Sequence, residues 1–257
     1  MAEARLSHLR MPEVVEREFE VAVLPIGSTE PHARHLAYGT DFFAVEQFAE
    51  QLVDEANRRG ARCLLLPTMP FSTNVNLDDC PWAMSLRPRT LLEFVRDVVD
   101  SVVRQGVRKV VIINGHGGNT GTLMSGLREL HGRCGAFVAL AEQWAASSDV
   151  EAEVKETQET GHACEIETSV MLHLCPEHVT MEAAEPTRTR KTIFSQRRGL
   201  SFVSPWHAYT VNTGIGDPTK ATAEKGRRMI EAAVDRLATT LKELSDAPMD
   251  DLFPYRD

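Results

Sequence analysis

Short apolar runs alternate along the first 140 residues with longer segments in which apolar residues recur at helical spacing. The short runs predict buried strands over residues 21–26, 63–67, 110–113 and 136–140. The longer segments predict helices over residues 42–58, 91–104 and 120–130. The same spacing beyond residue 140 predicts helices over residues 165–174 and 218–244. Strands that alternate with helices in this way predict an α/β fold, with a mainly parallel sheet covered by helices on both faces.

Two segments lack this regular pattern. Residues 145–161 are polar and acidic, which predicts an excursion over the surface. Residues 185–217 show little periodicity and are long for a loop, which favours a role in function or in an interface. The chain contains no internal repeat, low-complexity segment or evident linker, so residues 1–257 are expected to form a single domain.

Composition narrows the class of protein. The 42% hydrophobic and 25% charged content is ordinary for a soluble globular chain. A formal net charge of -9 argues against nucleic acid or an anionic membrane as the main partner. No apolar run is long enough for a transmembrane helix, and residues 1–10 lack the apolar centre of a secretory signal. The five cysteines are scattered without a C-x-x-C pair, which favours a reduced, cytoplasmic setting.

The first polar cluster lies between the first strand and the first long helix. It contains Glu30, His32, His35 and Asp41, which a plain strand-to-helix turn does not require. Carboxylates and imidazoles gathered at the carboxyl end of a strand are suitable ligands for a divalent metal. The alternative is a polar surface loop in which Thr40 or Asp41 caps the helix that follows.

The second cluster is N-G-H-G-G-N, residues 114–119, directly after the most apolar strand. Its glycines permit a tight turn that leaves His116 exposed at the strand end. A glycine-rich turn can also bind phosphate, but this one lacks both the G-x-G-x-x-G spacing and a Gly-Lys-Ser/Thr sequence. A histidine that only forms hydrogen bonds within the turn is the remaining alternative.

The third cluster, residues 161–169, contains His162, Glu165 and Glu167. The two glutamates would point about 200° apart on a helix, so only one of them can face a common site. Acidic residues in a first helical turn are also favoured by the helix dipole alone. Together the three clusters supply enough oxygen and nitrogen ligands for two metal ions that share one carboxylate.

These motifs resemble those of a known family. G-S-T-E-P-H-x-x-H-L-x-x-G-T-D, then N-G-H-G-G-N, then H-A-x-E-x-E-T-S, in this order, are similar to the creatininase family of metal-dependent amidohydrolases. Residues 214–226 are similar to the C-terminal segment of that family, so the resemblance covers roughly residues 20–230. It implies a three-layer α/β/α sandwich and a homo-oligomer, often a hexamer.

The resemblance also implies roles for individual residues. The implied ligands are Glu30, Asp41 and His116 for one metal ion, and His32, Asp41 and Glu167 for the other. Asp41 would bridge two divalent ions in each subunit, with zinc favoured and manganese or iron also compatible. His162 would be the general acid/base, and a metal-activated water would attack an amide or imide carbonyl.

The sequence departs from creatininase itself around the expected pocket. Gly118 stands where creatininase has a glutamate, and Gln158 stands where it has a tryptophan. Arg34 adds a charge beside the site. With the basic group Arg188, Arg190, Lys191, Arg197 and Arg198, it suggests a substrate that carries a carboxylate or phosphate. That basic group could equally contact a neighbouring subunit or remain solvated. We therefore expect a small polar substrate with a non-peptide, amide-type C–N bond, but not creatinine as the preferred one.

Five further side chains have open roles. His35 is expected to support the ligands through a hydrogen bond, with a ligand role as the alternative. Cys164 is expected to be a small buried residue and not a thiol nucleophile. Trp144 and the pair Trp206 and His207 are candidate pocket walls, the pair in this subunit or the next. Two other function classes stay open, a nucleotide-binding protein and a catalytically inactive oligomeric scaffold, and no substrate-binding residue is assigned.

Overall fold

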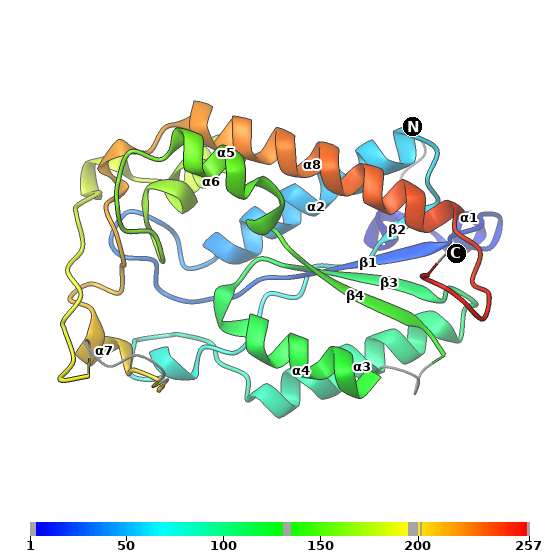
Figure 1. Ribbon diagram of the computed structural model, residues 1–257, viewed down its shortest axis with the longest axis horizontal. Coiled ribbons are helices and arrows are strands. Elements are labelled where there is room, and N and C mark those ends of the chain that lie inside the picture. The colour runs from blue at the N-terminus through cyan, green and yellow to red at the C-terminus, as the bar shows by residue number, and fades with distance from the viewer. Residues whose placement is uncertain (1–3, 131–134, 195–199, 201, 256–257) are drawn as a thin grey trace.

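The computed structural model describes residues 4–130, 135–194, 200 and 202–255. At its centre lies a parallel four-stranded sheet with the order β2-β1-β3-β4 (Figure 1). The strands are β1 Val21–Ile26, β2 Cys63–Leu65, β3 Lys109–Asn114 and β4 Phe137–Glu142. All six residues of β1 and of β3 are buried, as expected for strands that are covered on both faces.

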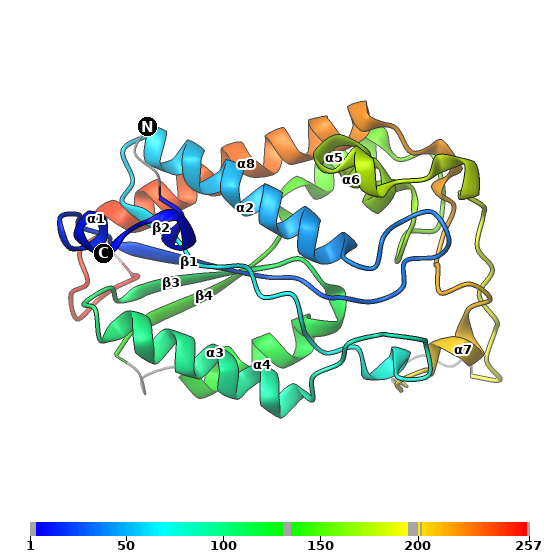
Figure 2. The same ribbon diagram turned by 180° about the vertical axis from the view of Figure 1, so that it is seen from behind.

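Helices cover both faces of this sheet. Helices α2 (Thr40–Arg58), α6 (Glu165–Leu174) and α8 (Ala223–Asp246) lie on one face, and α3 (Pro88–Val103) and α4 (Thr120–Leu130) lie on the other (Figure 2). Because side chains alternate along a strand, Val21 and Val23 pack toward the first group of helices, whereas Leu24 and Ile26 pack toward the second. The predicted three-layer α/β/α sandwich is therefore confirmed.

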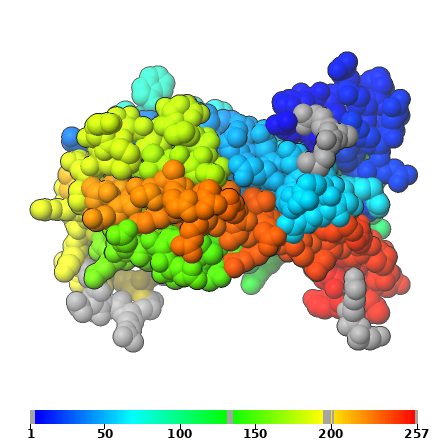
Figure 3. Space-filling view, turned by 90° about the horizontal axis from the view of Figure 1, so that it is seen from above, coloured from blue at the N-terminus to red at the C-terminus, as the bar shows by residue number. Residues whose placement is uncertain are grey.

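Shorter elements complete the chain. They are the helices α1 Met11–Val15, α5 Ser148–Val154 and α7 Trp206–Tyr209, and 3₁₀ turns at Leu6–His8, Val75–Leu77, Gly117–Asn119, Ala145–Ser147, Pro176–His178, Met181–Ala183 and Pro218–Lys220. Helix α8 forms a long ridge on the molecular surface, running beside α2 (Figure 3). None of the helices in the described chain has the length and apolar character that crossing a bilayer requires.

The structure corrects several sequence-based boundaries. Helix α2 begins at Thr40 after an N-cap at Gly39, so neither Thr40 nor Asp41 is the cap, and Asp41 lies in the first turn. The segment 145–161 contains α5, which packs on α8 and is not a simple surface excursion. The last helix begins only at Ala223, because Pro218 opens a separate 3₁₀ turn.

The carboxyl ends of the four parallel strands meet at one edge of the sheet, the end away from both chain termini (Figure 1). At this edge the chain leaves β1 through α2 toward β2 and leaves β3 through α4 toward β4. The neighbouring strands β1 and β3 therefore send their connections in opposite directions. Such a switch point opens a crevice above the strand ends, where open α/β sheets bind ligands.

Candidate metal centre

Four elements bring the five candidate ligands to this switch point. Glu30 and His32 follow β1, His116 follows β3, Asp41 lies in the first turn of α2, and Glu167 lies in the first turn of α6. All five side chains are buried, and His32 is fully inaccessible. Two overlapping groups have ligand atoms within 4.8 Å of one another, Glu30–Asp41–His116 and His32–Asp41–Glu167. These are the two groups that the resemblance implied, although the roles of their members as ligands stay predictions.

Asp41 lies between the two groups, and each of its oxygens faces a different imidazole. Asp41 Oδ1 lies 3.1 Å from His32 Nε2, and Asp41 Oδ2 lies 2.9 Å from His116 Nδ1. Glu30 Oε2 lies 3.4 Å from His116 Nε2 on one side, and Glu167 Oε1 lies 3.8 Å from His32 Nε2 on the other. This is the arrangement that a bridging carboxylate would need.

The outer nitrogen of each imidazole faces a backbone carbonyl. His32 Nδ1 lies 3.0 Å from the carbonyl oxygen of Glu30, and His116 Nε2 lies 3.2 Å from that of Thr73. A carbonyl can only accept, so in each ring this nitrogen carries the proton and donates it. A neutral ring would then turn a bare nitrogen toward an Asp41 oxygen, with two lone pairs facing each other. A cation bound between these atoms removes that conflict, and the outer hydrogen bonds are of the type that orients metal-binding histidines. The residues present therefore fit a divalent metal.

In the protein without metal, protons take the place of the cations. Burial opposes the charged form of His32, but Asp41 and Glu167 outweigh it and raise its pKa to about 10. Burial likewise opposes the charge of His116, but Glu30 and Asp41 raise its pKa to about 9. Burial raises the pKa of Glu167 to about 7. At neutral pH the two imidazolium groups thus partly neutralise the carboxylates of the site, even before a metal binds.

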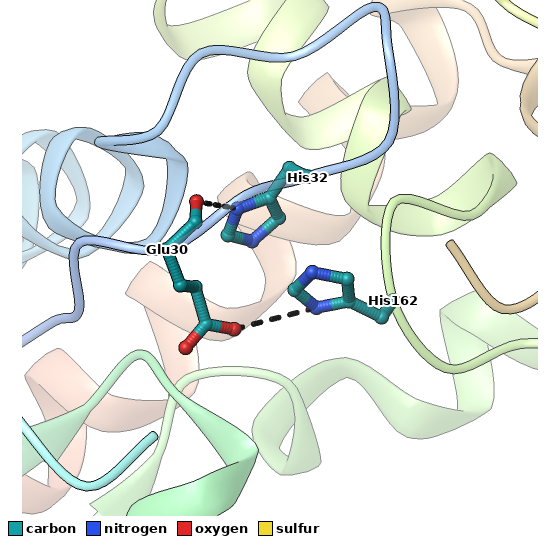
Figure 4. Close-up of side chains that lie close together, drawn as sticks. All are labelled: Glu30, His32 and His162. Atoms are coloured by element: carbon teal, nitrogen blue, oxygen red, sulfur yellow. Dashed lines mark hydrogen bonds and ion pairs between the residues drawn. The ribbon is translucent and has the colours of Figure 1, made fainter. Parts of the chain in front are cut away.

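His162 lies beside this group, just before α6. Its Nε2 lies 2.9 Å from the carbonyl oxygen of Pro31, and its Nδ1 lies 3.6 Å from Glu30 Oε1 (Figure 4). Its ring lies 4.0 Å from that of His32, centroid to centroid. Burial, with the nearby charge of His32, holds the pKa of His162 well below its usual range, so the ring is neutral with a free Nδ1. Glu30, His32 and His162 also form a third group that could hold a metal ion.

The glycine-rich turn is held by two asparagines and by a distant loop. Asn114 Nδ2 donates to the carbonyl of His116 (2.9 Å), and Asn119 Oδ1 accepts from the backbone N–H of Thr73 (3.1 Å). Thr73 in turn provides the carbonyl that orients His116. A Cβ at Gly118 would lie 2.7 Å from this Thr73 oxygen and would overlap His116 Nε2. The close approach of Thr73 therefore leaves no room for a side chain at Gly118.

The neighbours of Glu167 follow the sequence-based interpretation. Glu165 points away from the site and accepts hydrogen bonds from Thr157 N (2.7 Å) and Lys225 Nζ (2.6 Å). His35 Nε2 lies 2.8 Å from Thr168 Oγ1, beside Glu167 in α6, and its supporting role stays a prediction. Cys164 is 3% exposed, and burial raises the pKa of its thiol, so it is not an activated nucleophile.

A cavity of about 440 Å³ opens onto the candidate ligands. Its further lining comes from the tryptophans Trp144 and Trp206, from the acidic Glu151, and from Asn76, Gly115, Gly117, Gly118, Thr160, Gly161, Cys164, Ile166 and Ile215. Trp206 stands edge-on to His162, with centroids 4.7 Å apart. Trp206 is therefore a pocket wall within this subunit, which is one of the two alternatives given for it, and Trp144 is a second wall.

We expected basic side chains beside the substrate pocket, but among the described residues none of them lines the cavity. Arg34 points to solvent and lies 3.4 Å from Glu185, outside the cavity. Arg190 Nη1 donates hydrogen bonds to the backbone carbonyls of His207, Ala208 and Thr210 and so stabilises α7. Arg188 and Lys191 are exposed, whereas Arg197 and Arg198 lie outside the described residues. Gln158 is exposed and lines a separate surface hollow, and His207 pairs with Asp79 at 2.8 Å.

Some contributors to the site carry no signal in the sequence. The carbonyls of Thr73 and Pro31 orient two of the imidazoles, yet any residue offers a carbonyl. Glu151 lies in a segment with several other acidic residues, so its place in the cavity wall could not be singled out. Their contribution depends on how distant segments pack together.

Comparison with known proteins places this site in a family. Residues 7–241 match the creatininase family model, described as creatinine amidohydrolase. A mycofactocin precursor peptide peptidase from Mycobacterium ulcerans is 28% identical, over 88% of this chain and 86% of the relative. A creatinine amidohydrolase from Pseudomonas putida is 24% identical, over 87% of this chain and 89% of the relative.

Solved structures share the fold over nearly the whole chain. A putative creatinine amidohydrolase from Bacteroides fragilis superposes with a TM-score of 0.85 at 31% identity, and covers 97% of this chain and 99% of its own. A manganese form of creatininase superposes with a TM-score of 0.79 at 22% identity, over 96% of this chain and all of the other. A further creatininase structure is of a Zn–Zn type.

Proposed function

This chain belongs to the creatininase family, and on that premise we propose that it is a metal-dependent hydrolase of an amide-type C–N bond in a small polar molecule. The observation that carries the proposal is the position of Asp41. Its two oxygens face the inner nitrogens of His32 and His116, and the outer nitrogen of each ring donates its N–H to a backbone carbonyl. Glu30 and Glu167 complete the two groups of ligands. Such a donor set suits zinc, and also manganese or iron(II).

A divalent metal bound by these residues would polarise a carbonyl oxygen and lower the pKa of a water molecule toward neutrality. The chain's own contribution to the reaction is the handling of protons. His162 donates its Nε2–H to Pro31, which fixes the ring and leaves Nδ1 free to take up a proton. Because its pKa is lowered, this nitrogen releases the proton readily to a leaving amine. Trp144 and Trp206 add apolar walls to the cavity beside the candidate ligands.

The dimensions of the cavity support a small substrate. A volume of about 440 Å³ lies in the lower half of the range for small-molecule sites. One relative is named as a precursor peptide peptidase and another as a creatinine amidohydrolase, so a peptide is the second candidate substrate. With Gly118 in place of a glutamate, creatinine is not expected to be the best substrate.

The alternative of a nucleotide-binding protein is disfavoured by charge. A phosphate at the turn around His116 would meet the buried carboxylates of Glu30, Asp41 and Glu167. An inactive scaffold is disfavoured because the residues of the candidate centre are all present and oriented. We further propose that the chain forms a single domain and holds two metal ions per subunit. We also propose that the protein is a cytoplasmic homo-oligomer without nucleic-acid partners.

The test is a metal-dependent activity panel. The chelated protein is reloaded with Zn²⁺, Mn²⁺ or Fe²⁺ and assayed with cyclic amides, formamides, linear carboxamides and short peptides. We expect hydrolysis only after reloading, with a small amide other than creatinine giving the highest kcat/KM. Equal activity in the chelated and reloaded protein would overturn the metal-dependent mechanism, and creatinine as the best substrate would overturn the substrate assignment.

A further inference from the structure

The wall of the cavity has an unusual distribution of charge. Among the described residues, neither lysine nor arginine lines it, whereas four carboxylates do. Three of these, Glu30, Asp41 and Glu167, belong to the candidate metal centre. The fourth, Glu151, belongs to neither group of ligands, so bound metal ions would leave its charge uncompensated.

Helix α5 directs Glu151 into the cavity. Asp149 and Glu153, two residues before and after it, bind arginines of α8: Asp149 Oδ2 lies 2.7 Å from Arg236 and Glu153 Oε2 lies 2.8 Å from Arg228. Positions two apart on a helix point about 200° from each other. With its neighbours turned toward α8, Glu151 projects from the opposite side of α5, where it lines the cavity.

Glu151 also lacks a partner of its own. No ion pair or side-chain hydrogen bond joins its carboxylate to another residue of the described chain, although Asp149 and Glu153 are both paired. The same cavity wall includes Trp144 and Trp206. Aromatic faces attract cations, and a carboxylate binds an ammonium or guanidinium through charge-assisted hydrogen bonds.

We propose that Glu151 is a specificity-determining residue that binds a cationic nitrogen group, an ammonium or a guanidinium, on the molecule that enters this cavity. In so far as that molecule is a substrate, the inference rests on the proposed function. From the sequence we expected an anionic substrate. This proposal replaces that expectation with a cationic one.

Two probes of equal shape and different charge test this directly. Methylguanidinium and its neutral analogue methylurea are titrated by calorimetry into the zinc-loaded full-length protein. We expect methylguanidinium to bind at least about tenfold more tightly, which is the effect of one charge-assisted hydrogen bond. The variant Glu151→Gln keeps the shape of the side chain, and it should lose most of this preference. Glu153→Gln on the same helix, whose partner is Arg228, is the matched control and should keep it.

Three results would overturn the assignment: equal binding of the two probes by the parent, an unchanged preference in Glu151→Gln, or the same loss of preference in Glu153→Gln. The outcome is separable from that of the proposed function. A zinc-loaded parent that prefers methylguanidinium but hydrolyses nothing in the amide panel rejects the hydrolase and leaves the role of Glu151 standing. Hydrolysis without a preference for the cation rejects the role of Glu151 alone.

Discussion

Asp41 is the residue on which the two halves of the candidate centre depend, because each of its oxygens faces a different histidine. Removal of a shared carboxylate should therefore disturb both metal positions, whereas removal of a terminal ligand should disturb one. The burial of the whole group strengthens this expectation, since water cannot replace a lost ligand easily.

Asp41→Ala is predicted to lose both metal ions, and His32→Ala to lose mainly one. Elemental analysis of the purified, metal-reloaded variants measures the stoichiometry. His178→Ala is a suitable control, because His178 stacks on Phe43 outside the cavity and should have no effect on metal content. Equal metal content in Asp41→Ala and the parent would rule out the bridging role.

His162 is predicted to act in chemistry and not in metal binding. His162→Ala should retain its metal and lose about 10²–10⁴-fold in kcat, the usual contribution of a general acid/base. Metal content and kcat are measured on the same sample. Because His162 Nδ1 lies 3.6 Å from Glu30 Oε1, loss of metal from this variant would instead identify it as a ligand.

At the scale of elements, the turn after β3 is held in place by the loop before α3, which lies against it. The backbone of Thr73 approaches Gly118 so closely that a methyl group there would collide with the Thr73 carbonyl and with His116. At Gly117, one position earlier, an added Cβ would meet nothing within 4 Å. The two glycines thus offer a matched pair of sites in one turn.

Gly118→Ala is predicted to weaken metal affinity by about 10–100-fold, because it displaces the carbonyl that orients His116. Gly117→Ala should change stability by no more than about 0.5 kcal/mol and leave metal affinity unchanged. Competition with a chelator of known affinity gives both metal dissociation constants, and thermal unfolding gives the stabilities. Equal effects of the two substitutions would show that the Thr73 contact is unimportant.

At the scale of the whole molecule, the metal centre couples folding to pH. The folded protein raises the pKa of His116 to about 9 and that of His32 to about 10, above the usual value near 6.5. Groups with raised pKa values contribute stability that is fully present below the unfolded pKa and is lost as the pH rises through the folded pKa. The metal-free protein should therefore lose stability between about pH 6.5 and 10.

Metal binding should have the opposite dependence, because the ion must displace these protons. The difference in Tm between zinc-loaded and metal-free protein is predicted to widen as the pH rises over this interval. Buried thiols such as Cys63, whose pKa burial raises to about 12, destabilise both forms alike at high pH, so their effect cancels in the difference. A difference in Tm that is constant or narrows with pH would contradict the assignment of His32 and His116 as proton-bearing ligands.

The sequence by itself determined the layers of the fold and predicted which residues are candidate metal ligands. Apolar runs and helical spacing report burial between neighbours along the chain, so the strands and the long helices were predictable within a few residues. The angle between successive helical positions predicted that only one of Glu165 and Glu167 can face the site, and the family resemblance indicated Glu167.

Only the tertiary structure decided what surrounds those donors. Thr73 orients His116 through a backbone atom common to all residues, Arg34 turns to solvent and pairs with Glu185, and Glu151 faces the cavity because its neighbours bind α8. Each of these outcomes depends on contacts between segments far apart in the chain. Local periodicity carries no information about such contacts, because they are fixed by the packing of helices and loops around the sheet.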